Sequence, residues 1–164
     1  MSEPAADPTD APIVGVAFLL AQLGAHATAR YARRVADLGL TPAHTGVLRF
    51  VGLAPGPSQQ ALAGRLGVAP SRIVALVDDL ERQGLVERRR GAADRRSYAL
   101  YLTAAGEETL AAVRDAAVAH EGEVTAALPD AERRELVRLL RALAEAHGLL
   151  PGVHPGYRTL GPSA

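Results

Sequence analysis

The chain has 164 residues, about the size of one domain, with 48% hydrophobic and 22% charged residues, which excludes a wholly disordered protein. The absence of cysteine and lysine excludes disulfides, thiolate metal sites, cysteine nucleophiles, Schiff-base lysines and Walker A phosphate loops. Because the net charge is zero, a polyanion-binding surface must gather its positive charge in one region.

Residues 1–12 combine three prolines with small and acidic side chains, so we expect a disordered lead. The apolar run at 13–23 follows acidic rather than basic residues, which argues against a secretory signal. The polar residues Gln22 and His26 keep the apolar stretch shorter than a membrane span. We therefore expect a cytoplasmic protein with no membrane partner.

A first helix is predicted over residues 13–38. Its first half is apolar almost all the way round, which indicates burial on more than one side and suggests a partner subunit. Thr41 and Pro42 fit the N-cap and first position of a second helix, which we expect to run to about residue 53.

Two shorter helices follow. Ser58 is expected to cap a helix over 59–66 that Gly67 ends. The next helix begins at Pro70 and continues up to Gly84. Its buried stripe recurs at helical spacing and consists of Ile73, Leu76, Val77 and Leu80. Two short helices joined by a glycine-containing turn are the signature of a helix-turn-helix.

A basic hairpin is predicted next. Two short strands at 85–88 and 98–102 are joined by a polar segment at 89–97. From Arg82 to Arg96, six arginines stand against two acidic residues. This stretch is where we expect a polyanion to bind.

The rest of the chain is predicted to be helical up to a tail. A helix from residue 103 to about 128 has apolar residues at roughly heptad spacing, and Pro129 interrupts it. An amphipathic helix covers 130–147. Residues 148–164 contain seven glycines and prolines, which end the helix.

Three motifs occur in order along the core of the chain. They are Leu40-Thr41, Ser58-Gln59-Gln60-Ala61-Leu62-Ala63 with Leu66-Gly67-Val68, and Asp94-Arg95-Arg96 followed by Leu100, Leu102 and Thr103. With these motifs, residues 40–109 resemble the MarR family of bacterial transcriptional regulators. The resemblance implies a mainly α fold with a small β-hairpin wing.

The resemblance also implies one domain over residues 13–147. A winged helix-turn-helix lobe at 41–103 is expected to bind double-stranded DNA, with dimerisation helices at 13–38 and 104–147 and a Gly/Pro-rich tail at 148–164. One recognition helix reads only a few base pairs, so we expect a homodimer on a pseudopalindromic operator.

The predicted recognition helix has a small or polar outer face that suits the major groove. Arg72 is expected to pair with a guanine, with a phosphate contact as the alternative, while Ser71 and Ala75 allow close approach. Ser58 is expected to favour a phosphate at a helix N-terminus, to act as a plain cap, or both. The predicted contacts of this region are Ser58, Gln59, Gln60, Pro70, Ser71, Arg72, Ala75 and Arg82.

For the hairpin, the resemblance implies a wing along the minor groove, with an arginine near its tip inserted and Asp94 holding Arg96. The predicted wing contacts are Arg89, Arg90, Asp94, Arg95 and Arg96. The alternative for Arg88 to Arg90 is a solvated strand edge that discourages pairing with other chains. Asp78 and Asp79 are expected to pair with neighbouring arginines or to tune selectivity.

The resemblance further implies a small aromatic or phenolic effector in a cleft between the dimerisation helices and the winged lobe. The residues predicted to contact the effector are His26, Tyr31, His44 and Arg49. Each of them is alternatively an ordinary packing or surface residue. The five histidines are not paired at i, i+3 or i+4, so neither a metal site nor a cofactor is expected.

The leading hypothesis is therefore a ligand-responsive, dimeric DNA-binding regulator, most simply a repressor. The alternative is a winged-helix module that binds protein without sequence-specific DNA binding. An enzyme is not expected, because the sequence contains no recognisable nucleophile, metal cluster or cofactor loop.

Overall fold

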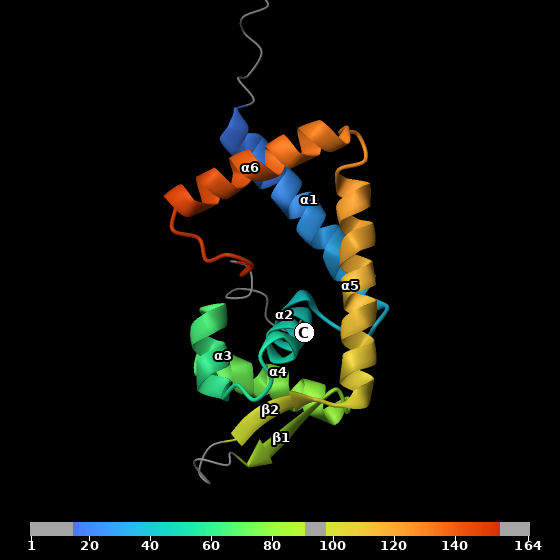
Figure 1. The fold of residues 1–164 in the computed structure, drawn as a ribbon, viewed down its shortest axis with the longest axis vertical. Helices are drawn as coiled ribbons and strands as arrows, with labels where there is room; N and C mark the ends of the chain where they lie inside the picture. The colour runs from blue at the N-terminus through green and yellow to red at the C-terminus, as the bar shows by residue number, and fades with distance from the viewer. Residues whose placement is uncertain (1–14, 91–97, 155–164) are drawn as a thin grey trace, which may run out of the picture.

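The computed structural model describes residues 15–90 and 98–154 (Figure 1). The expected lead at 1–12 and the wing residues Asp94, Arg95 and Arg96 lie outside the described residues. In chain order the elements are α1 (Val16–Ala36), α2 (Pro42–Leu53), α3 (Gln59–Leu66), α4 (Pro70–Arg82), β1 (Val86–Arg90), β2 (Tyr98–Leu102), α5 (Ala104–Val124) and α6 (Asp130–Ala146). This order confirms the predicted mainly helical fold with a two-stranded wing.

The core lies in the lobe formed by α2, α3, α4 and the hairpin. Side-chain caps set the starts of the helices: Ser58 Oγ accepts the N–H of Ala61, and Thr103 Oγ1 accepts that of Gly106. Their apolar faces then meet in a continuous cluster. Its largest fully buried side chains are Leu48, Leu62, Leu66, Ile73, Leu80 and Leu100.

The wing is joined to the start of α3 by backbone hydrogen bonds. β1 and β2 are antiparallel, with Arg88 opposite Leu100. On the other edge of β2, Leu100 donates its N–H to Pro57 and accepts from Gly56, at 3.0 and 2.9 Å. An isolated bridge joins Ser58 to Ala99. Both edges of β2 are therefore paired.

A helical arm extends away from the lobe (Figure 1). α5 runs from the wing to the turn before α6, and α1 packs against it. Glu123 of α5 accepts hydrogen bonds from Arg30 and Arg34 of α1, and the former spans 2.7 Å. These ion pairs fasten the two arm helices to each other.

The apolar first half of α1 is not buried within the single chain. Val16, Phe18 and Leu23 are 57–67% exposed. None of the described α6 residues, Asp130–Ala146, is buried either, although Leu136, Leu139, Leu140 and Leu143 give the helix an apolar side. The apolar surface that the sequence assigns to burial is thus left uncovered on the arm.

Several boundaries differ from the predictions by a few residues, and two of these differences have a local cause. α5 ends at Val124 rather than near residue 128, because Thr125 leaves helical geometry and its carbonyl accepts the N–H of Leu128 in a turn. β1 extends to Arg90 because its pairing with β2 continues through a run of arginines that has no apolar alternation to reveal it. Over the described residues, no helix has the length and hydropathy to cross a membrane.

Candidate nucleic-acid interface

The outer face of α4 carries the predicted base-reading residues. Pro70, Ser71 and Ala75 are exposed there, while Ile73 and Val77 of the opposite face are fully buried. Arg72 is half-buried, and its Nε is shielded without a hydrogen-bond partner among the described residues. The amino-terminal half of α4 therefore exposes small side chains and Val74 around one arginine.

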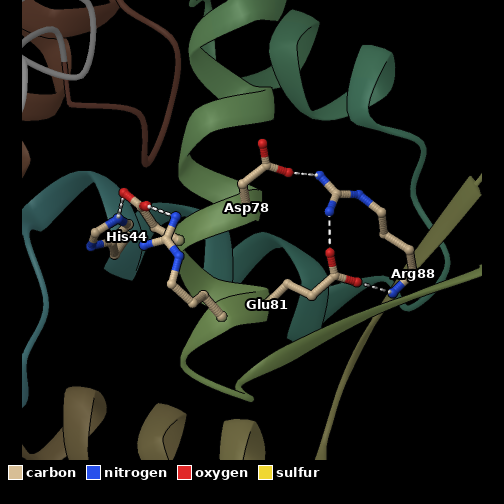
Figure 2. A network of polar contacts seen from close by, with 6 residues as sticks. His44, Asp78, Glu81 and Arg88 are labelled. Carbon is tan, nitrogen blue, oxygen red and sulfur yellow. Dashed lines mark hydrogen bonds and ion pairs between the residues drawn. The ribbon is translucent and has the colours of Figure 1, made fainter.

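The acidic residues of α4 are paired with arginines, as predicted (Figure 2). Asp78 Oδ1 lies 2.5 Å from Nη2 of Arg88, and Asp79 Oδ1 lies 2.9 Å from Nη2 of Arg82. Arg82 itself is 72% exposed. The ion pairs offset the negative charge that would otherwise repel a phosphate backbone.

Arg88 connects the wing to α4, a role that the sequence prediction missed. Its guanidinium hydrogen-bonds to Asp78 and Glu81, and its backbone N–H donates to Glu81 at 3.3 Å (Figure 2). Burial disfavours the charged guanidinium, but the bonds to both carboxylates outweigh it and raise the pKa of Arg88. A sequence signal for this role exists. Side chains alternate along a strand, so Arg88, two residues after the buried Val86, is expected on the core-facing side.

His44 is bound into the lobe by contacts at both ring nitrogens. Its Nδ1 accepts the N–H of Thr41 at 3.2 Å, and its own N–H donates to Thr41 Oγ1, which completes a capping box. Its Nε2 lies 3.6 Å from Asp79 of α4. Burial lowers the pKa of His44, and the neighbouring Asp79 carboxylate opposes this effect in part.

The start of α3 contributes three of the predicted contacts. Ser58 Oγ accepts the N–H of Ala61 at 3.1 Å, so its role as a cap is present. With its amide oxygen turned toward the guanidinium, Gln59 accepts from Nε and Nη2 of Arg88, each at 2.8 Å. Gln60 is exposed. Gln59 thus belongs to the Arg88 cluster, and Gln60 faces solvent.

The described part of the wing carries two of its predicted arginines. Arg89 is 58% exposed, pairs with Glu87, and lies with its guanidinium carbon 4.6 Å from the ring centre of Tyr101. The aromatic ring holds that cation on the outer side of the hairpin. Arg90 is exposed at the end of β1.

The four candidate effector residues are placed in different surroundings. Tyr31 donates to Thr45 Oγ1 at 3.3 Å, and its ring centre lies 5.5 Å from that of His120, so α1, α2 and α5 meet there. Burial and the charge of Arg34 lower the pKa of His120. His26 is exposed on α1.

The other two candidates have partners elsewhere. The ring of His44 contacts Thr41 and Asp79, and Arg49 donates to the carbonyl of Gly152 in the tail. A cavity of about 320 Å³ between α2, β2 and α5 is lined by none of the four. Among the described residues, no group of three or more histidines and carboxylates could hold a metal ion.

Comparisons with known proteins agree with this geometry. The model of the MarR family matches residues 38–97, which include the helix-turn-helix and the first strand of the wing. A putative transcriptional regulatory protein for the hcr operon of Thauera aromatica is 40% identical over 105 residues, which are 64% of this chain and 63% of that relative.

Two solved structures are similar over most of their length. The transcriptional repressor CouR, bound to a 23-mer DNA duplex, is 34% identical with a TM-score of 0.71, covering 79% of this chain and 92% of that one. A MarR family protein of Mycobacterium tuberculosis in complex with salicylic acid is 30% identical, with a TM-score of 0.64, covering 82% and 97%.

These matches identify the class of protein as well as its fold. The chain belongs to the MarR family. Within that family it is a transcriptional regulator, like the relatives just named.

Proposed function

We propose that this regulator is a homodimeric repressor that acts in the cytoplasm, binds a pseudopalindromic double-stranded operator, and is modulated by a small aromatic or phenolic ligand. Its lobe at 41–103 would bind DNA, and its helices at 13–38 and 104–147 would form the dimer. The observation that carries the proposal is the outer face of α4, where Ser71 and Ala75 are exposed beside Arg72. Small side chains around an arginine allow a helix to approach base edges in the major groove.

The proposal includes further contacts outside α4. Ser58 and Gln60 at the start of α3, and the exposed Arg89 and Arg90 on β1, are proposed to add to the DNA-binding surface. The likeness to a repressor solved on a DNA duplex supports the assignment. The proposal also includes the wing residues Asp94, Arg95 and Arg96, which lie outside the described residues.

The uncovered arm supports the dimer. Phe18 and Leu23 of α1 and Leu139 and Leu143 of α6 are 42–58% exposed in the single chain. Apolar faces of this extent indicate a protein interface. A two-fold partner on the arm would present two recognition helices to one side of the duplex, about 34 Å apart.

Selection of duplexes from a random DNA library at near-physiological salt tests the DNA-binding proposal. We expect enrichment of a two-fold symmetric motif with half-sites about 10 base pairs apart. Affinity for that duplex should fall with salt with a log-log slope magnitude above roughly 5. No enrichment, with a flat salt response, would replace the proposal with the protein-interaction module.

The ligand proposal has its own test. Salicylate is the probe, because a relative was solved with salicylic acid. Titrating salicylate into the complex with the selected duplex should release DNA, and Tyr31→Phe or His26→Ala should shift the concentration needed. Binding of DNA that is indifferent to millimolar salicylate would remove this compound from the candidate effectors.

A further inference from the structure

We propose that Arg88 is a positioning residue for operator recognition, which clamps the wing to the recognition helix without itself contacting DNA. The inference rests on the proposed DNA-binding function and adds the residue that sets the geometry between its two reading elements. Arg88 belongs to β1, and both of its carboxylate partners belong to α4.

The strand register directs Arg88 toward the helices rather than toward solvent. Side chains alternate along β1, so Val86, Arg88 and Arg90 share one face. Val86 is 1% exposed, and Leu100, directly opposite Arg88, is fully buried. The Arg88 side chain is only 19% exposed, so this cation is largely covered on the inner face of β1.

The clamp uses both the side chain and the backbone of Arg88. One terminal nitrogen contacts Asp78 and the other contacts Glu81. Leu100 directs its backbone groups to residues 56 and 57, so the N–H of Arg88 opposite it faces the free edge of β1, where Glu81 accepts it. The fork geometry of a guanidinium fixes direction as well as distance.

Two consequences for DNA binding follow from these contacts. Both terminal nitrogens of Arg88 are occupied by carboxylates, so they are not directed at a phosphate. Arg90 lies two residues further on the same face of the strand that Arg88 anchors. The position of the wing relative to α4 therefore depends on Arg88, and the groove contacts of the wing depend on that position.

The decisive variant removes the two carboxylates and keeps the arginine. Asp78→Asn with Glu81→Gln deletes two negative charges from α4, which by electrostatics alone would strengthen DNA binding. If Arg88 holds the wing against α4, the same double variant also releases the wing from α4. The matched control is Glu108→Gln with Asp115→Asn, two exposed carboxylates of α5 that have no ion pair among the described residues.

Affinities are measured for the duplex returned by the selection and for a scrambled duplex, with dimer mass and thermal unfolding as folding checks. We expect the Asp78/Glu81 variant to lose about tenfold in affinity for the selected duplex while its affinity for the scrambled duplex holds or rises. The control should show no loss on either duplex. A gain on both duplexes by the Asp78/Glu81 variant would overturn the clamp.

A second measurement separates positioning from direct contact. Arg88→Gln should weaken specific binding with an unchanged salt slope, and Arg88→Lys should restore part of the loss. A fall in slope of about 0.9 would instead make Arg88 a phosphate contact and overturn the proposal. If Arg88→Gln does not fold, the carboxylate variant alone decides the question. Failure of the wild-type protein to select any duplex would count against the proposed function, not against the clamp.

Discussion

The Nε2 atom of His44 lies 3.6 Å from a carboxylate oxygen of Asp79, and this contact joins α2 to the recognition helix (Figure 2). Because Nδ1 of the same ring accepts the N–H of Thr41, it must be unprotonated, and the proton of the neutral ring is on Nε2, facing Asp79. One neutral imidazole therefore caps α2 and reaches α4.

This geometry predicts a pH-dependent stability. The pKa of His44 is lower in the folded protein than its ordinary value, so the unfolded chain binds more protons just below pH 6.5. The free energy of unfolding should be fully maintained above that pH and fall as the solution is acidified through it, by at most about 1.4 kcal/mol per pH unit. Chemical denaturation from pH 8 to 5 measures the slope.

His44→Gln is the matched variant for this prediction, because glutamine retains the capping acceptor and does not titrate. The pKa of His120 is also lowered, so His120→Gln is needed to subtract its share. If the His44→Gln and wild-type proteins lose stability in parallel on acidification, the His44 ring does not couple to folding in this way.

Gly106 is expected to be intolerant of any side chain. A Cβ at this position would lie 1.9 Å from the carbonyl oxygen of Leu85, where the wing meets α5. Gly106→Ala should destabilise the protein by about 1–3 kcal/mol or more, because backbone must shift to relieve the clash. Gly122→Ala in the same helix meets nothing within 4 Å and should stabilise by about 0.5–1 kcal/mol. Thermal unfolding of the two variants compares them directly.

Arg72 and Arg82 are expected to differ in what they contribute to DNA binding. Arg72→Ala should relax preference at one base step in each half-site by about 1–3 kcal/mol if the proposed pairing of Arg72 with a guanine holds. Arg82→Ala should weaken all sequences alike, because that side chain is 72% exposed at the far end of α4. Repeating the duplex selection with each variant shows the difference. A uniform loss for Arg72→Ala would make it a phosphate contact.

The arm is expected to hold the dimer together. Leu139→Glu on α6 or Leu23→Glu on α1 should shift the protein toward monomer, because each places a charge on the uncovered apolar surface. Leu53→Glu changes a side chain that is 68% exposed at the end of α2 and should leave the assembly unchanged. Sedimentation velocity distinguishes these cases. A wild-type protein that sediments as a monomer would contradict the interface.

The fold was predictable wherever a local signal was strong. Ser58, Thr41 and Thr103 each mark a helix start through an oxygen that accepts a nearby N–H. The buried stripe of α4 follows from helical spacing alone. The length of β1 was underestimated, because arginines continue its pairing without the apolar alternation that signals a strand.

The site was less predictable because its key contacts join distant segments. The pairing of Asp78 and Asp79 with arginines was anticipated, but the particular partner Arg88 depends on the register of β1 against α4. His44 shows the same limit: its spacing from Thr41 indicates a capping box, whereas its approach to Asp79 requires the packing of α2 on α4.

β2 is paired with β1 on one edge and with residues 56–58, just before α3, on the other. The hairpin is therefore continuous in hydrogen bonding with the segment that leads into α3. Tilting the wing would require breaking the bonds of Leu100 to residues 56 and 57 as well as moving Arg88 away from α4. The wing and α4 should therefore move together as one rigid unit relative to the arm. In the proposed dimer, a change in how the two arms pack would therefore alter the distance between the two copies of α4 rather than the tilt of either wing.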